Sequence, residues 1–69
     1  MTTYYVRGDT DDWTASNAKT LSAAKRECTE LYRHCKNIPL YVGARKGNVS
    51  DPRIKTVTWK DLTGKWNES

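Results

Sequence analysis

The fold is decided by residues 21–36, which read LSAAKRECTELYRHCK. Apolar side chains recur in this stretch at spacings of three and four residues, the spacing of one face of an α-helix. They are Leu21, Ala24, Cys28, Leu31, Tyr32 and Cys35. Charged and polar residues occupy the other side, where Arg26 and Glu30 form an i,i+4 pair of opposite charge. The pattern predicts one amphipathic helix over residues 21–36.

Both ends of this predicted helix carry boundary signals. Thr20 and Ser22 suit the N-terminal end, because their hydroxyl oxygens can accept hydrogen bonds from free backbone N–H groups. At the other end, Lys36 supplies a cation near the negative end of the helix dipole, and Asn37 tolerates a left-handed cap. Pro39 cannot continue a helix, so the chain should become extended from there.

Two segments on either side of the helix alternate like half-buried strands. In residues 2–7 the alternation places Tyr4 and Val6 on one face, with Tyr5 and Arg7 on the other. Residues 40–45 behave in the same way. Their predicted inward residues are Leu40, Val42 and Ala44, and their predicted outward residues are Tyr41 and Arg45.

A further strand is predicted over residues 54–60, with Val57 and Trp59 on one face and Thr56 and Thr58 on the other. Gly64 favours a tight turn, after which Trp66 would fold back beside Trp59 as an aromatic cross-strand pair. Residues 67–69 are interpreted as a polar tail.

Residues 13–19 are ambiguous. Trp13 and Thr14 suit a second strand paired with residues 2–7, whereas Trp13 and Ala18 also fit an early start of the helix. The first choice gives an α+β domain of order ββαββ with a short final strand. The second gives βαββ with a longer helix. In both, one helix packs on one face of an antiparallel sheet, and residues 1–69 form a single small domain.

The composition limits the size of the core. The chain has 69 residues, no Phe, three Trp and four Tyr, so much of its apolar burial must come from rings with a polar atom. A domain of this length buries roughly 60% of the surface of its unfolded chain. A net stability of ~3–5 kcal/mol is therefore expected.

Cysteine usage indicates a reducing compartment. Cys28 and Cys35 are the only cysteines, and seven residues of continuous helix would separate their Cα atoms by about 10.5 Å. A disulfide requires a separation below about 7 Å, so we expect two reduced thiols. The sequence contains neither a signal-peptide pattern nor a long apolar run, and we expect a cytoplasmic protein.

Catalytic and metal-binding roles find little support. His34 is the only histidine, and no nucleophile is placed by sequence as its partner. Cys28, His34 and Cys35 lack the close ligand pairs and the fourth ligand of a zinc site. Residues 9–12 resemble the start of a calcium loop, but Trp13 and Thr14 stand where that loop requires a ligand and a glycine. We therefore expect no enzyme, metal or cofactor.

The sheet face that the helix leaves uncovered is the predicted binding surface, because aromatic and basic residues alternate on it. The candidate binding residues are Tyr5, Arg7, Tyr41, Arg45, Lys55, Trp59 and Trp66. Lys46, Lys60 and Lys65 are assigned to the same face or its rim. The same residue types also stabilise small sheets without any ligand, so packing alone is the competing interpretation.

Two functions fit this surface. In the first, the aromatic face docks a protein partner or a second copy of the chain, as in the small inhibitors and adaptors that mobile elements encode. In the second, the rings stack on bases of single-stranded nucleic acid while cations follow the phosphates. The net charge of +4 and the isoelectric point near 9.3 are compatible with both.

Overall fold

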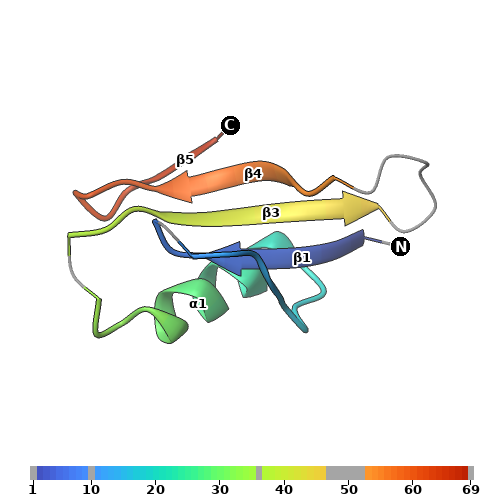
Figure 1. Ribbon diagram of the computed structural model, residues 1–69, viewed down its shortest axis with the longest axis horizontal. Coiled ribbons are helices and arrows are strands. Elements are labelled where there is room, and N and C mark those ends of the chain that lie inside the picture. Colours follow the sequence, from blue (N-terminus) through green and yellow to red (C-terminus); the bar gives the residue numbers. More distant parts are fainter. Residues whose placement is uncertain (1, 10, 36, 47–52, 69) are drawn as a thin grey trace.

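The computed structural model describes residues 2–9, 11–35, 37–46 and 53–68. Its elements are β1 (Thr2–Arg7), β2 (Thr14–Ala15), α1 (Leu21–Leu31), β3 (Leu40–Lys46), β4 (Lys55–Lys60) and β5 (Trp66–Glu68). The strands form one antiparallel sheet in the order β2-β1-β3-β4-β5, and α1, the one helix among the described residues, lies on one side of it (Figure 1). The predicted α+β class is confirmed. The alternative with a helix starting near Trp13 is wrong, because Thr14 and Ala15 pair with β1.

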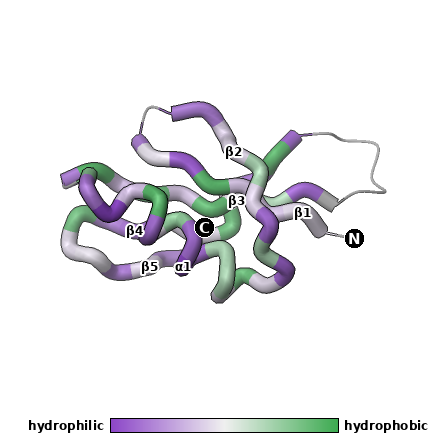
Figure 2. The backbone as a smooth tube through the Cα atoms, turned by 90° about the horizontal axis from the view of Figure 1, so that it is seen from below, coloured by the Kyte–Doolittle hydropathy of each residue, from purple (hydrophilic) through white to green (hydrophobic). Residues whose placement is uncertain are grey.

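The core lies between α1 and the two central strands, β1 and β3. Its buried apolar side chains come from those three elements and are Val6, Ala24, Cys28, Leu40 and Val42. Hydrophobic and hydrophilic residues are interleaved along the strands rather than grouped (Figure 2). This interleaving is the expected pattern where only one face of a strand is buried. The predicted inward side chains Val6, Leu40 and Val42 are therefore confirmed.

Helix α1 is shorter than predicted at its C-terminal end. It starts as expected, with Thr20 as N-cap residue accepting a hydrogen bond at Oγ1 from the Ala23 N–H at 3.2 Å. It ends at Leu31 rather than Lys36, and Lys36 itself lies outside the described residues. The Leu31 side chain is 56% exposed and Cys35 is exposed, so beyond Cys28 only Tyr32 of the predicted apolar stripe packs against the core. Without tertiary packing, the last turns of so short a helix gain little stability.

A β-bulge changes which side chains of β4 face the core. Val42 pairs with Thr58 but the next residue, Gly43, pairs with Thr56, so Val57 has no partner of its own. Val57 packs against the core and Thr58 is fully buried, although the simple alternation predicted opposite faces for them. The Thr58 hydroxyl donates a hydrogen bond to the Asn67 carbonyl at 2.6 Å, which makes its burial tolerable.

The turn before β5 is organised by Asp61. Its carboxylate accepts hydrogen bonds from the backbone N–H groups of Thr63 and Lys65 and from the side-chain amide of Asn67. Hydrogen bonds to the carboxylate lower the pKa of Asp61, with the largest effect from the Thr63 side chain and the next from that of Asn67. Gly64 has the predicted positive φ, at 88°. β5 returns beside β4 and includes Asn67 and Glu68, so the interpretation of residues 67–69 as a polar tail is wrong for both of them.

The two thiols differ sharply in exposure. Both are free, Cys28 buried and Cys35 exposed, and burial raises the pKa of Cys28 to about 11. We expect Cys35 to react readily with a disulfide reagent at neutral pH in the folded protein, and Cys28 to react only on unfolding, because the thiolate is the nucleophile. The amount of reagent thiolate released per protein molecule, measured with and without denaturant, checks this expectation. Equal reaction rates for both thiols would contradict the burial of Cys28.

None of the helices in the described part of the chain has the length and apolar character needed to cross a membrane.

Candidate binding face

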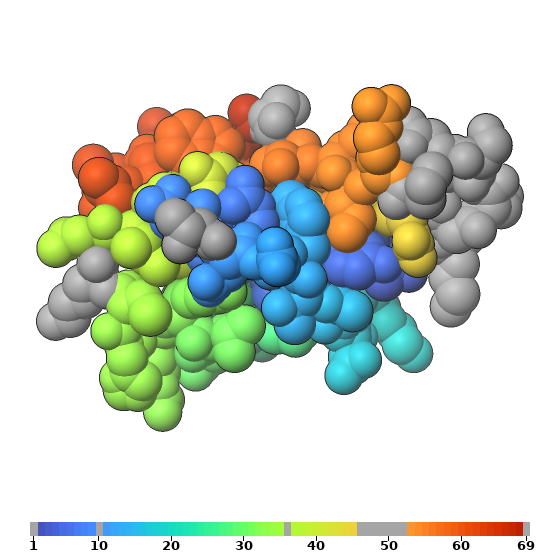
Figure 3. Space-filling view, viewed as in Figure 1, coloured from blue at the N-terminus to red at the C-terminus, as the bar shows by residue number. Residues whose placement is uncertain are grey.

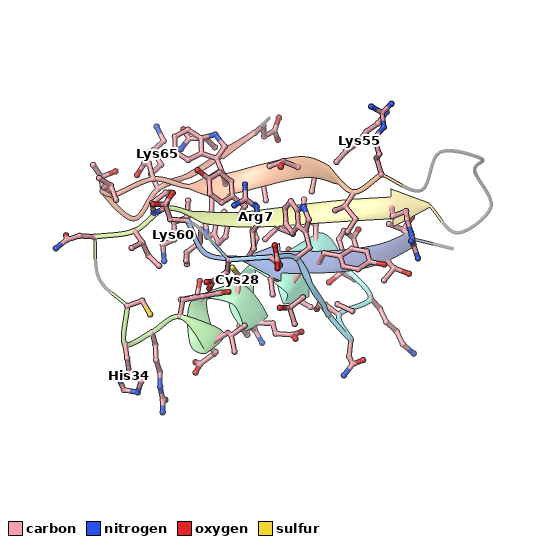
Figure 4. The ribbon with its side chains drawn as sticks, viewed as in Figure 1. Arg7, Cys28, His34, Lys55, Lys60 and Lys65 are labelled. Atoms are coloured by element: carbon pink, nitrogen blue, oxygen red, sulfur yellow. The ribbon has the colours of Figure 1, made fainter. Side chains whose placement is uncertain are left out.

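The sheet face opposite α1 carries a row of large side chains across three strands. Arg7 of β1 lies directly across from Tyr41 of β3, which in turn lies across from Trp59 of β4. Residues opposite each other in an antiparallel pair share a face, so these three side chains lie side by side. All three are half-buried although no helix covers them. Figure 4 shows Arg7 at the centre of the sheet.

Stacking contacts hold this row together. The Arg7 guanidinium lies 4.2 Å from the centroid of the Tyr41 ring and 5.1 Å from that of Trp13. The Tyr41 and Trp59 rings are 6.5 Å apart and 23° from parallel. We call the resulting set, Trp13, Arg7, Tyr41 and Trp59, the aromatic row.

Arg7 is positioned by its own loop as well as by the rings. Its guanidinium donates hydrogen bonds to the carbonyl oxygens of Gly8 at 3.2 Å and Asp9 at 3.0 Å. Two carbonyls and two rings therefore fix a cation that the sequence suggested would be free to bind a ligand. Within the row, the Arg7 guanidinium therefore contacts both the Trp13 ring and the Tyr41 ring.

A second cation–ring pair lies further along the same face. The Arg45 guanidinium is 5.7 Å from the centroid of the Tyr5 ring, and Tyr5 lies opposite Gly43 in the register of β1 and β3. Arg45 is exposed, unlike Arg7. Of these two arginines, Arg45 is therefore the one that a ligand can reach.

Gly43 explains how Trp13 reaches the row. A Cβ atom at Gly43 would lie 2.6 Å from the Ile54 Cγ2 and 2.9 Å from the Trp13 ring, distances too short for real contacts. Both side chains therefore rest directly on the backbone of β3. In Figure 3 the segment between β1 and β2, which carries Trp13, lies across the centre of the visible surface. Sequence reasoning did not assign Trp13 to the site, and a glycine within a strand was the available signal.

We expect Gly43→Ala to destabilise the protein by ~1–3 kcal/mol, because an added methyl group forces apart packed side chains. The fluorescence of Trp13 should change with the same substitution, since its ring must move away from β3. Urea unfolding followed by tryptophan emission measures both effects. An unchanged unfolding midpoint would contradict the close packing of Trp13 and Ile54 on β3.

The structure brings together five of the seven predicted binding residues, namely Tyr5, Arg7, Tyr41, Arg45 and Trp59. The other two, Trp66 and Lys55, lie on the other side of the sheet. Trp66 pairs with Lys60 and packs against the core, so the predicted pairing of Trp59 with Trp66 is wrong. Lys55 lies opposite Ala44 of β3, and Ala44 lies opposite Tyr4 of β1. Because Tyr4 packs against the core, Lys55 is on the helix side of the sheet. Figure 4 shows Lys55 well apart from Arg7.

The three lysines assigned to the rim fall in different places. Lys60 lies opposite Leu40, which is a core residue, so it belongs to the helix side of the sheet. Lys65 is exposed in the turn before β5. The side chain of Lys46 lies outside the described part of the structure.

Catalytic groups do not converge on this face. His34 is exposed beyond the end of α1, where its Nε2 accepts a hydrogen bond from Arg33 at 3.2 Å (Figure 4). Within the described residues, no three His, Cys, Asp or Glu side chains come close enough to hold a metal ion. The described residues of the face offer aromatic rings and an exposed cation, Arg45, a composition suited to binding.

Comparison with protein-family models, with curated proteins and with solved structures found no match.

Proposed function

We propose that the protein is a small non-enzymatic binding module that docks a protein partner, or a second copy of itself, through its open sheet face. The observation that carries the proposal is the aromatic row, which spans β1, β3 and β4 on the side away from α1. Tyr, Trp and Arg are the residue types enriched among the strongest contributors to protein interfaces. An inhibitor or adaptor of the kind encoded by mobile elements would fit this size and surface.

The state of Arg7 favours a protein over a nucleic acid as the partner. Its guanidinium is already bonded to two carbonyl oxygens and enclosed by two rings, which leaves it poorly placed to pair with a phosphate. Exposed carboxylates also follow it in the β1–β2 segment, at Asp9 and Asp12. Negative charge beside the row would repel a polynucleotide backbone. Rigid rings fixed in advance suit a protein surface, because little entropy is lost on binding.

Arg45 is the observation that supports the alternative, a single-stranded nucleic-acid-binding accessory protein. It is exposed and lies over the Tyr5 ring, so a base could stack on the ring while the guanidinium contacts a phosphate. Titration with short single-stranded DNA and RNA at several salt concentrations separates the two functions. Binding that weakens steeply with salt and is lost on Arg45→Glu would establish the alternative.

Differential capture tests the proposed function itself. Immobilised wild-type protein and the double variant Tyr41→Ala/Trp59→Ala are compared for the proteins they retain, with nuclease present. We expect a partner retained by the wild type and by the control Leu31→Ala, but lost from the double variant. Leu31 is a suitable control because it is 56% exposed and lies on α1, away from the row. Equal retention by all three proteins would overturn the proposal, unless light scattering showed a dimer that only the double variant abolishes.

A further inference from the structure

A groove on the helix side of the sheet forms a second candidate surface. Helix α1 packs over β1 and β3, so β4 and β5 extend beyond it on that side. A cavity of about 290 Å³ lies between the C-terminal part of α1 and the turn before β5. Its lining includes Tyr32, Ile38, Leu40, Lys60 and Leu62. Leu62 is 65% exposed, although it is a large aliphatic residue.

Two lysines without acidic partners among the described residues lie near the Trp66 ring, and one of them, Lys60, also lines this cavity. The Nζ atoms of Lys25, on α1, and Lys60, on β4, lie 5.6 Å and 6.0 Å from the centroid of the same ring, that of Trp66. Neither lysine forms an ion pair with any described residue. The carboxylate that lines the cavity, Asp61, is engaged by the hydrogen bonds of its own turn. Two like charges are thus held near one ring, an arrangement that an anionic group would stabilise.

We propose that this groove binds an acidic segment of a partner protein. An aliphatic side chain of the segment would enter the cavity against Ile38, Leu40 and Leu62, and neighbouring carboxylates would pair with Lys60 at the cavity and with Lys25 beside the Trp66 ring. The combination of an apolar wall with unpaired cations selects this occupant. A bare anion would leave the apolar wall exposed, and a polynucleotide backbone has no branched aliphatic side chain to place there.

This inference does not depend on the proposed function of the aromatic row. Trp66 and Lys60 pair with each other on the helix side, whereas Tyr41 and Trp59 lie on the opposite face. A variant of either surface should therefore leave the other intact, and the two proposals can fail separately.

NMR titration with a capped peptide of alternating glutamate and leucine tests the inference. We expect saturable shifts of the Trp66 indole and of the amides of Tyr32 and Lys60. The dissociation constant should rise about tenfold or more in Lys25→Gln/Lys60→Gln, because both charge-assisted contacts are lost. Lys25→Arg/Lys60→Arg, which keeps both charges, should bind as the wild type does. Lys19→Gln/Arg26→Gln removes the same charge at exposed positions and should also leave binding unchanged.

Three results would overturn the inference. The first is the absence of saturable shifts at millimolar peptide. The second is equal binding of a peptide in which glutamine replaces every glutamate. The third is an equal response to inorganic phosphate or to oligothymidylate, which would make the groove a general anion site.

Discussion

Leu40→Ala is expected to leave much of the protein unfolded at 25 °C. Leu40 is 6% exposed and belongs to the small set of side chains buried between α1 and the sheet. Truncating a buried leucine to alanine typically costs 2–5 kcal/mol, through lost burial and a residual cavity. A domain of this length has only ~3–5 kcal/mol of stability to lose. Circular dichroism with urea titration measures the remaining folded fraction.

The matched control for this prediction is Leu31→Ala, which removes the same atoms from a side chain that is 56% exposed. It should change the free energy of unfolding by about 0.5 kcal/mol or less. Similar effects for the two substitutions would contradict the placement of the core beneath α1.

Tyr41→Ala is expected to weaken binding of the partner by about 2 kcal/mol or more, close to a thirtyfold rise in Kd. Tyr41 is the central ring of the aromatic row, with the Arg7 guanidinium 4.2 Å from its centroid and the Trp59 ring 6.5 Å away. Removing the ring therefore loses its own contact with the partner, and it also leaves the side chains of Arg7 and Trp59 free to move. Calorimetric titration of the purified partner into each variant measures the loss.

Tyr41→Phe separates the ring from its hydroxyl group. Because the stacking contacts involve the ring, the Phe variant should keep most of the affinity. Loss of affinity in Tyr41→Phe equal to that in Tyr41→Ala would mean that a hydrogen bond of the hydroxyl, rather than the stacked row, carries the binding.

The sequence predicted the strands in which apolar and polar side chains alternate without interruption and the helix end that carries a local capping residue. Alternation in residues 2–7 and 40–45 correctly separated Val6 and Val42 from Arg7 and Tyr41, because each of these strands has one buried face. Thr20 correctly marked the start of the helix, since an N-cap is a local feature. The C-terminal end of the helix was missed because it depends on whether another element covers Leu31.

The errors at the candidate site arise where the two-residue alternation of side chains is interrupted or where strand register decides the pairing. The bulge opposite Val42 and Gly43 reverses the alternation along β4, which moves Lys55 to the other side of the sheet. The register of β5 then places Trp66 across from Lys60 instead of Trp59. Both depend on hydrogen bonding between strands, which no single segment encodes.

Trp13 was missed for a different reason. It precedes a strand of only two residues, so alternation says nothing about where its ring lies. Its position follows from the space above Gly43 and from the cation of Arg7, both supplied by other strands.

Photo-crosslinking from adjacent residues on opposite faces tests the central claim most directly. Tyr5 lies on the face of the aromatic row, whereas Tyr4 packs against the core on the helix side. The photoreactive residue p-benzoylphenylalanine is placed at each position in turn, and the folded variants are irradiated with the captured partner or at high protein concentration. We expect an intermolecular protein adduct from position 5 and little from position 4. Adducts from position 4 alone, or adducts to nucleic acid from position 5, would contradict docking of a protein on the open face.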